Sequence, residues 1–521
     1  MNSRALPAGL VLVLLAILVV APLVGLVNLG GLPGYQPDDL QFWQSAYIRR
    51  VLSFSLWQAL LSTLCSVLPA ILVARAFALQ PSFALRAFLL RLFALPLVVP
   101  AVVAVMGIVS VYGSDGWIPL GRSLYGLNGI LLAHAFFNLP LAVRLLLPLW
   151  QTIPQSHWQL AEQLGMNAWQ RWRFLEWPAL REGLPGVVLL IFMLCLTSFA
   201  VVLTLGGGPR STTLEVAIYQ SLRFDFDPVR AVVLALLQLA LCVLVATLTF
   251  RMQRLPEVEI SIDPVTHDDC RGHKPANLVL ILLATLFVAT PMISMLVDAL
   301  TGPVLAVLGS VALWQSVANT LFIGLTAASL AVVAGWFLLR YSASLALAGQ
   351  PGRARVVDLA GSIIYVVPPL VIGTGTFVLL SAHVDVFTWI YPIVITINAL
   401  MGLPFVIRSL GPAMRQNHAR YHLLCQSLAL EGWNRFRYVE WPLLRRPLGL
   451  ATALAAALAM GDLGVIALFG TPATATLTLL IYQQLGAYLI PSATVTAILL
   501  LLLCLSVFWL LERGIGGRFD A

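Results

Sequence analysis

One carboxylate, Asp462, stands within a long apolar stretch of the sequence and is flanked by Gly461 and Gly464. Charged groups are costly inside a membrane, so a carboxylate there needs a compensating contact. Two interpretations follow. Asp462 could line a pathway and offset the charge of a cation, or it could accept a buried hydrogen bond from Ser198 or from a backbone amide. Ser198 is its counterpart in an internal repeat, which makes the pair Ser198 and Asp462 the candidate pathway residues.

The sequence does not favour enzymatic chemistry. It contains no His-Glu-x-x-His and no Gly-x-Ser-x-Gly motif. Its one lysine, Lys274, does not belong to a phosphate-binding Gly-Lys-Ser/Thr loop. The six cysteines lack metal-site spacing, and His267, Cys270 and His273 fit a solvated linker better than a zinc site. We therefore expect no catalytic residue, no metal site and no cofactor bound by this chain.

Two polar segments interrupt the apolar pattern and resemble one another. The first runs Leu160-Ala161-Glu162-Gln163-Leu164-Gly165, and then has Trp169, Arg171, Arg173 and Glu176-Trp177-Pro178. The second runs Leu424-Cys425-Gln426-Ser427-Leu428-Ala429, and then has Trp433, Arg435, Arg437 and Glu440-Trp441-Pro442. Matched residues are 264 positions apart. We call these segments the first and second hairpin.

The composition predicts an all-α polytopic membrane protein. Hydrophobic residues make up 60% and charged residues 10% of the chain, whereas soluble proteins carry about 25% charged residues. Apolar runs long enough to cross a bilayer predict about twelve helices, at 6–29, 52–79, 88–113, 126–150, 184–205, 229–250, 276–299, 313–341, 356–382, 387–412, 448–469 and 491–512. The net charge of +8 comes from basic residues at helix ends, so it does not indicate nucleic acid.

Basic residues also predict the orientation. With both termini, both hairpins and the central linker in the cytoplasm, most of them lie inside, and Arg49, Arg50, Arg122, Arg210, Arg223 and Arg230 lie outside.

The predicted domains follow the helices. Residues 1–50 hold the first helix and a periplasmic segment, and 51–251 form a first transmembrane domain with a coupling loop at 155–180. A cytoplasmic linker at 252–275 leads to the seventh helix and a second periplasmic segment at 276–312. Residues 313–513 form the second transmembrane domain, with its coupling loop at 419–444, and 514–521 are a cytoplasmic tail.

The repeat extends beyond the hairpins. Trp57-Gln58 and Thr63-Leu64 match Trp314-Gln315 and Thr320-Leu321, and Val98-Val99-Pro100 matches Val366-Val367-Pro368. Six helices separate equivalent positions. Because six is even, the halves have the same orientation, which predicts two parallel six-helix halves related by an axis along the membrane normal. A pathway would lie on that axis.

Each hairpin is predicted as two short helices joined by a tight turn. In the first, Leu160 to Leu164 form one helix and Gly165 provides a left-handed turn. A second helix runs from about Ala168 to Leu175 and is limited by Pro178. The alternative interpretation is an amphipathic surface hairpin without a partner. The presence of two equivalent copies favours docking sites for a two-fold partner.

Ala161-Glu162-Gln163 with Gly165, followed by Trp177-Pro178, resembles the EAA loop of ABC importer permeases. The resemblance covers nearly the whole chain as two fused type-1 transmembrane domains. It implies that Ala161, Glu162, Gln163 and Gly165 couple one hairpin to a homodimeric ATPase that binds ATP and Mg. Cys425, Gln426, Ser427 and Ala429 would couple the other hairpin. The second copy departs from the motif, since Ala429 replaces the turn glycine, and so we expect a milder effect of substitution there.

Within that family the chain is similar to thiamine and thiamine pyrophosphate permeases of the bacterial inner membrane. The stretches that carry this similarity include Phe137-Asn138-Leu139-Pro140, Leu205-Gly206-Gly207-Gly208-Pro209 and the ten residues from Gly461 to Gly470. The resemblance implies a periplasmic substrate-binding protein as a second partner. We expect the loops 206–228 and 471–491, each containing Tyr-Gln, to face it; Tyr219 and Tyr482 could instead be interfacial belt residues.

Three other functions remain as alternatives. The same architecture could import ferric iron or another small solute. A twelve-helix secondary transporter would need ionisable groups inside the membrane, and only Asp462, with His134 as a possible second, is available. An intramembrane enzyme would need a clustered catalytic set, which the sequence lacks.

Overall fold

The computed structural model describes residues 2–27, 45–80, 83, 85–114, 116–120, 124–252, 274–362, 366–381 and 383–517. The described residues form helices joined by turns, with no strand among them. The predicted all-α class is confirmed. Most of the predicted linker at 252–275, with His267, Cys270 and His273, lies outside the described residues, as do much of the first periplasmic segment and half of the predicted tail.

The two halves contain similar successions of helices. The first half contains α1 (Asn2–Val27), α2 (Ala46–Leu79), α3 (Arg86–Leu92), η4 (Leu95–Leu97), α4 (Ala101–Tyr112), α5 (Leu127–Gln151), α6 (Gln155–Gln163), α7 (Ala168–Arg171), η6 (Trp172–Glu176), α8 (Trp177–Leu196), α9 (Ala200–Leu205), η7 (Pro209–Ser211), α10 (Leu214–Arg223) and α11 (Pro228–Met252). The second contains α12 (Lys274–Thr301), α13 (Val304–Leu308), α14 (Val311–Leu347), α15 (Pro351–Ser362), α16 (Pro369–Ser381), η9 (Val386–Trp389), α17 (Ile390–Ser427), α18 (Gly432–Arg435), η10 (Phe436–Glu440), α19 (Trp441–Gly461), α20 (Gly464–Phe469), η11 (Pro472–Thr474), α21 (Leu477–Gly486) and α22 (Ile490–Gly516).

The third helix of each half is broken rather than continuous. Ten helical segments among the described residues are long and apolar enough to cross a membrane. The predicted spans at 88–113 and 356–382 are wrong as single helices, because α3 and α4, and likewise α15 and α16, are separate elements. Pro100 directly precedes α4, and Pro368 directly precedes Pro369, the first residue of α16. Proline lacks a backbone donor, so each helix restarts there.

The fifth predicted helix of each half is broken as well. In the first half, α8 ends at Leu196 and α9 begins at Ala200; in the second, α19 ends at Gly461 and α20 begins at Gly464. The two breaks hold Ser198 and Asp462. The candidate pathway residues therefore lie at equivalent interruptions of backbone hydrogen bonding, not within continuous helices. Inside a bilayer such interruptions are tolerated only where the protein satisfies the freed groups.

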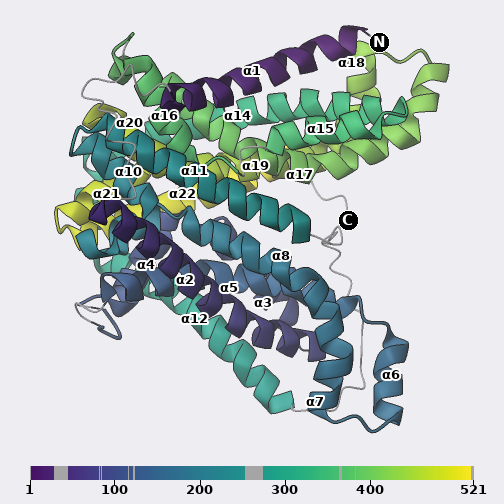
Figure 1. Cartoon of the computed structure of the whole chain (residues 1–521), viewed down its shortest axis with the longest axis horizontal. Coiled ribbons are helices and arrows are strands. Elements are labelled where there is room, and N and C mark those ends of the chain that lie inside the picture. The colour runs from purple at the N-terminus through teal and green to yellow at the C-terminus, as the bar shows by residue number, and fades with distance from the viewer. Residues whose placement is uncertain are drawn as a thin grey trace.

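The first helix of each half packs against the opposite half. In Figure 1 the purple α1 lies among the green helices of the second half, and the teal α12 lies beside first-half helices. α1 contacts α16 and α14, whereas α12 contacts α4 and α2. The backbones approach closely, since a Cβ on Gly375 would stand 2.3 Å from the Pro22 carbonyl oxygen and one on Gly107 would stand 2.7 Å from that of Pro291. Small residues permit such crossings.

The structure changes the predicted alignment of α2 with α14. Ser55 Oγ accepts a hydrogen bond from Leu214 N at 2.9 Å, and Thr320 Oγ1 accepts one from Leu477 N at 2.9 Å. Equivalent residues of these helices are therefore 265 positions apart. The predicted match of Trp57 with Trp314 is wrong by eight residues, about two helical turns, because both tryptophans are exposed and no buried contact fixes their register.

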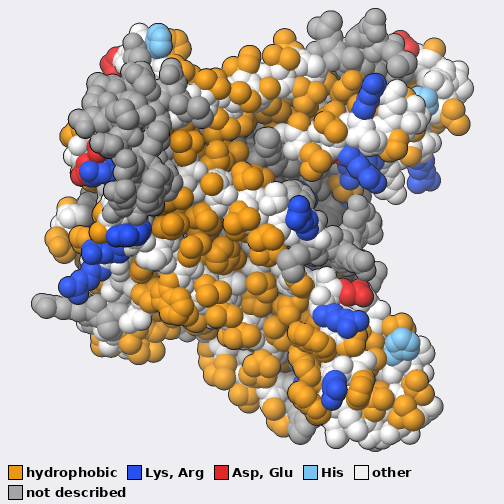
Figure 2. Space-filling model, viewed as in Figure 1, with side chains coloured by type: hydrophobic (Ala, Val, Ile, Leu, Met, Phe, Trp, Pro, Cys, Tyr) orange, Lys and Arg blue, Asp and Glu red, His pale blue; other side chains and the backbone are white. Residues whose placement is uncertain are grey.

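Both hairpins lie at the same end of the molecule. Figure 1 shows α6 and α7 at one corner and α18 at the other corner of the right-hand side, with α10, α20 and α21 at the opposite end. The predicted parallel arrangement of the halves is confirmed. Figure 2 shows hydrophobic side chains over the middle of this face and arginines toward both ends, the distribution of a protein that crosses a bilayer.

Candidate functional site: two surface hairpins and two helix breaks

The first hairpin has the turn that the glycine predicts. α6 ends at Gln163, and Gly165 adopts φ +61°. Met166 N donates to Ala161 O at 3.0 Å and Gly165 N donates to Glu162 O at 2.9 Å, the bond pair of a glycine-terminated helix. Asn167 then caps α7 in a reciprocal pair with Gln170, with both bonds 2.9 Å long. The loop is thus held at both sides of the turn.

The second hairpin has the same turn although alanine replaces glycine. Ala429 adopts φ +49°, with bonds from Leu430 N to Cys425 O at 2.8 Å and from Ala429 N to Gln426 O at 3.1 Å. Because both copies have the left-handed turn, the reason given for a milder effect of substitution at Ala429 does not hold. The real difference lies before the turn: α17 continues unbroken to Ser427, whereas Thr152 to Pro154 separate α5 from α6 in the first half. Proline at 154 imposes that separation.

Pro178 does not end the second helix of the hairpin, contrary to the prediction. The residues before it, Trp172–Glu176, form a π-helical turn that continues into α8, and Phe436–Glu440 do the same before α19. Proline stands near the first position of each following helix, where its missing donor costs little. Each hairpin is therefore rigidly continuous with a membrane helix that reaches the break at Ser198 or Asp462.

The predicted coupling residues divide into buried and exposed sets. Ala161 and Cys425 are buried and fix the short helices against the protein. The exposed residues are Glu162, Gln163, Gly165, Gln426, Ser427 and Ala429. Around them large apolar side chains project outward at equivalent places, namely Leu160, Leu164 and Trp169 in the first hairpin and Leu424, Leu428 and Trp433 in the second. Matched exposed apolar patches of this kind mark interaction sites.

A buried carboxylate anchors each hairpin, which the site prediction missed. Glu176 is fully buried and pairs with Arg75, with Nε to Oε2 at 2.6 Å; Trp150 Nε1 also donates to it at 3.0 Å. Glu440, also fully buried, pairs with Arg435 at 2.9 Å and Arg340 at 3.5 Å. The signal was present in the sequence, because each carboxylate and the Trp-Pro that follows it occur in both copies.

Asp462 satisfies the backbone at the second break. Its carboxylate oxygens accept from Gly464 N at 3.1 Å and from Val465 N at 3.2 Å, while Thr478 Oγ1 donates to its carbonyl at 2.7 Å. The side chain of Asn398 also interacts with the carboxylate. The carboxylate therefore makes the backbone-amide hydrogen bonds that the second, structural interpretation of Asp462 predicted.

At the first break, glutamine side chains donate hydrogen bonds to the backbone carbonyls that the break leaves unpaired. Gln58 Nε2 donates to Cys195 O at 3.0 Å, and Gln238 Nε2 donates to Leu196 O at 3.4 Å. These are carbonyls at the end of α8 that have lost their helical partners. Phe199, the neighbour of Ser198, reaches the other half, toward Gly464.

The loops 206–228 and 471–491 meet at the boundary between the halves. Tyr219 on α10 and Tyr482 on α21 are repeat counterparts, and their hydroxyl groups interact electrostatically. Arg223 Nη2 also donates to Gly470 O of the second half at 3.2 Å. Tyr219 is buried, so it is not a belt residue. Asp225 and Tyr488 are exposed on the same loops.

Two interleaved helical halves, with broken helices at their boundary and an exposed hairpin on each, form the architecture of a polytopic membrane protein. The chain belongs to the family described as binding-protein-dependent transport system inner membrane component, whose model matches residues 66–255 and 353–513. It is accordingly a transport permease rather than an enzyme.

Similar proteins cover almost the whole chain. The thiamine transport system permease protein ThiP of Brucella abortus strain 2308 is 43% identical, over 100% of this chain and 97% of its own length. The ThiP proteins of Escherichia coli K12 (44%, over 93% and 92%) and Haemophilus influenzae (40%, over 88% and 87%) are comparable. No solved structure matches the chain.

Proposed function

We propose that this chain is the membrane subunit of an ATP-driven importer that carries thiamine and thiamine pyrophosphate across the bacterial inner membrane. The observation that carries the proposal is identity of 40–44% over nearly full length to relatives named for thiamine transport. Those names favour thiamine over ferric iron.

A separate, homodimeric ATPase would bind ATP and Mg and dock on the two hairpins. The matched exposed patches support this, since a two-fold partner presents two identical grooves. In this arrangement the hairpins, both termini and the linker lie in the cytoplasm, as the distribution of arginine favours. A periplasmic binding protein would deliver substrate to the loops 206–228 and 471–491 at the other end.

The substrate would pass between the halves at the level of Ser198 and Asp462. The position of both residues at helix breaks supports this proposal, because irregular backbone within a membrane domain occurs where it lines a cavity or is covered by protein. Thiamine is a cation, and the carboxylate of Asp462 could offset its charge.

Reconstitution in proteoliposomes tests the function. The chain, its ATPase and its binding protein would be combined, and uptake of labelled thiamine measured with each component omitted in turn. We expect uptake to require all three and ATP. Uptake that persists without the ATPase and collapses with a protonophore would identify a secondary transporter instead.

A further inference from the structure

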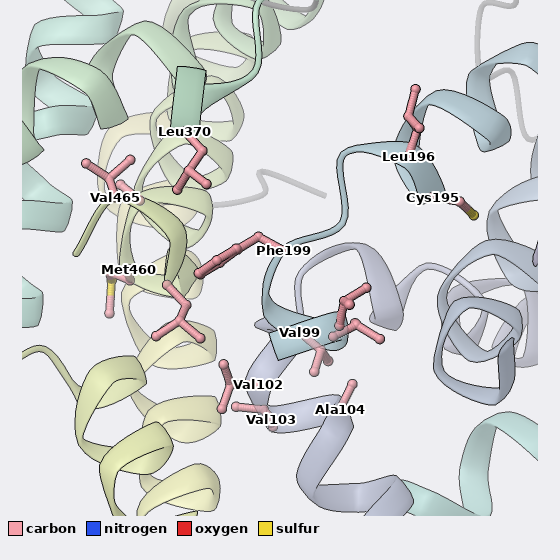
Figure 3. Packing of buried hydrophobic residues seen from close by; sticks show 14 of the residues in the cluster. Val99, Val102, Val103, Ala104, Cys195, Leu196, Phe199, Leu370, Met460 and Val465 are labelled. Atoms are coloured by element: carbon pink, nitrogen blue, oxygen red, sulfur yellow. The ribbon is translucent and has the colours of Figure 1, made fainter. Parts of the chain in front are cut away.

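A phenylalanine from the first half fills the boundary at the level of the two breaks. Figure 3 shows Phe199 extending from its own half toward Leu370, Val465 and Met460 of the second half. Phe199 is only 7% exposed. A Cβ built on Gly464 would lie 3.7 Å from Phe199 Cδ1 and 3.6 Å from Asp462 Oδ1. The ring therefore covers the glycine beside the carboxylate.

Two tyrosines extend this aromatic layer across the boundary. The rings of Phe199 and Tyr219 meet edge to face, with centroids 5.4 Å apart. Tyr219 also interacts electrostatically with Tyr482 in the second half, and α10 is tied to that half by the bond from Arg223 Nη2 to Gly470 O at 3.2 Å. On the other side of Asp462, a Cβ on Gly461 would lie 3.2 Å from Pro100 Cβ of the first half. Side chains of the first half thus cover both glycines that flank Asp462.

We propose that Phe199, Tyr219 and Tyr482 form an aromatic seal that closes the pathway and, on opening, becomes a transient site for an organic cation. This inference rests on the proposed function. Separation of the halves would lift Phe199 from Gly464 and uncover the Asp462 carboxylate. The uncovered surface would combine aromatic faces, which attract organic cations, with one negative charge. Closure excludes water because the contacting surfaces are aromatic and aliphatic, as in a hydrophobic gate.

The seal is tested by passive leak without ATP or binding protein. The full chain with its ATPase would be reconstituted in vesicles loaded with labelled tetramethylammonium. Phe199→Ala should raise efflux about tenfold or more, because removing the ring opens a hydrophobic constriction. Phe199→Tyr, which keeps a ring, should leak no more than the unmodified protein.

Phe136→Ala is the matched control. Phe136 is a fully buried ring on α5, in the same half, so its removal also leaves a cavity in the protein. It should not increase efflux. Equal leak from Phe136→Ala and Phe199→Ala, or no leak from a folded Phe199→Ala protein, would refute the seal.

The role of Asp462 is tested in the open variant. In Phe199→Ala vesicles, efflux of tetramethylammonium would be compared with efflux of neutral mannitol. Adding Asp462→Asn should lower this ratio several-fold, since asparagine keeps a capping oxygen for the backbone amides but carries no charge. An unchanged ratio would refute the cation site. Efflux of tetramethylammonium does not depend on recognition of thiamine. If thiamine uptake fails but the variants leak as expected, the proposed substrate is refuted and the proposed seal is not.

Discussion

At the scale of single residues, Ala429 and Gly165 show how one turn is built from two residue types. Both adopt positive φ and both donate the same backbone bond. Left-handed geometry brings the Cβ of alanine toward the next carbonyl oxygen, at a cost of about 1–2 kcal/mol. The second hairpin therefore carries strain that the first avoids.

Exchanging the two residues should move stability in opposite directions. Ala429→Gly should stabilise the protein by about 1 kcal/mol, and Gly165→Ala should destabilise it by a similar amount, because only glycine is free of the Cβ contact. Thermal unfolding of both purified variants in detergent checks this. Destabilisation by Ala429→Gly would show that the strain is relieved elsewhere.

Asp462→Asn distinguishes a pathway carboxylate from a structural one. If the charge offsets the thiazolium cation, thiamine uptake should fall more than thiamine pyrophosphate uptake, since the pyrophosphate carries its own negative charge. Separate uptake assays for the two substrates, together with a melting curve, provide the measurement. Equal losses accompanied by a lower melting temperature would assign Asp462 to the structural role alone.

At the scale of elements, the hairpins are predictable from the sequence because they are polar in an apolar chain and occur twice. Their limits are less predictable. The π-helical turns before Pro178 and Pro442 merge each hairpin with a membrane helix, and no residue pattern announces a π turn. Similarly, the sequence identified Asp462 as a candidate functional residue. Its bonds to Gly464 and Val465 were not predictable, because they depend on a helix break that apolar periodicity does not show.

Proline at the turn should uncouple both hairpins. Gly165→Pro would require φ near −65° where the structure has +61°, and it would remove the donor that bonds Glu162 O. Ala429→Pro loses the equivalent bond to Gln426 O, so its effect should be as large. Transport and ATPase stimulation in vesicles should both fall, with normal membrane insertion. Wild-type values for an inserted Gly165→Pro protein would contradict the coupling role.

The buried carboxylates should hold the hairpins in place. Glu176→Ala leaves Arg75 without its partner, and breaking such a pair typically costs about 3–5 kcal/mol. Arg75 is partly exposed, which moves the expected value to the lower end of that range. Thermal unfolding measures the loss. The double variant Arg75→Met with Glu176→Leu should recover most of it; a double variant as unstable as Glu176→Ala would argue that the site needs the charges themselves.

At the scale of the whole molecule, the parallel halves were predictable from six intervening helices, but their interleaving was not. α1 and α12 are apolar nearly all round, so periodicity does not reveal which neighbour each will choose. The neighbour that each helix packs against depends on close backbone crossings at Gly375 and Gly107. A glycine in an apolar helix does not by itself predict such a crossing. The register of α2 against α14 was mispredicted for a similar reason. Identical residue types suggested an alignment, but the buried contacts that determine the register are not visible in the sequence.

Interleaving should keep the halves together without a covalent link. If a protease site is inserted in the linker at 252–275 and cleaved, the two fragments should remain associated in detergent and retain transport, since α1 and α12 each pack on the opposite fragment. Co-purification through a tag on one fragment measures the association. Separation of the fragments would mean that these contacts contribute little.

The crossing of α1 also has a consequence for the order of synthesis. Its contact with α16 joins Pro22 to Gly375, whereas α12 meets α4, which already exists when α12 is made. At about 5–20 residues per second, the ribosome needs roughly 18–70 s to reach the partner of α1. The helix must spend that interval in the bilayer without its partner α16. The mean hydropathy of its apolar part, Pro7–Leu26, is 3.0, the highest among the ten spans found in the described residues. This suits a segment that must be stable in lipid before its binding site on α16 has been translated.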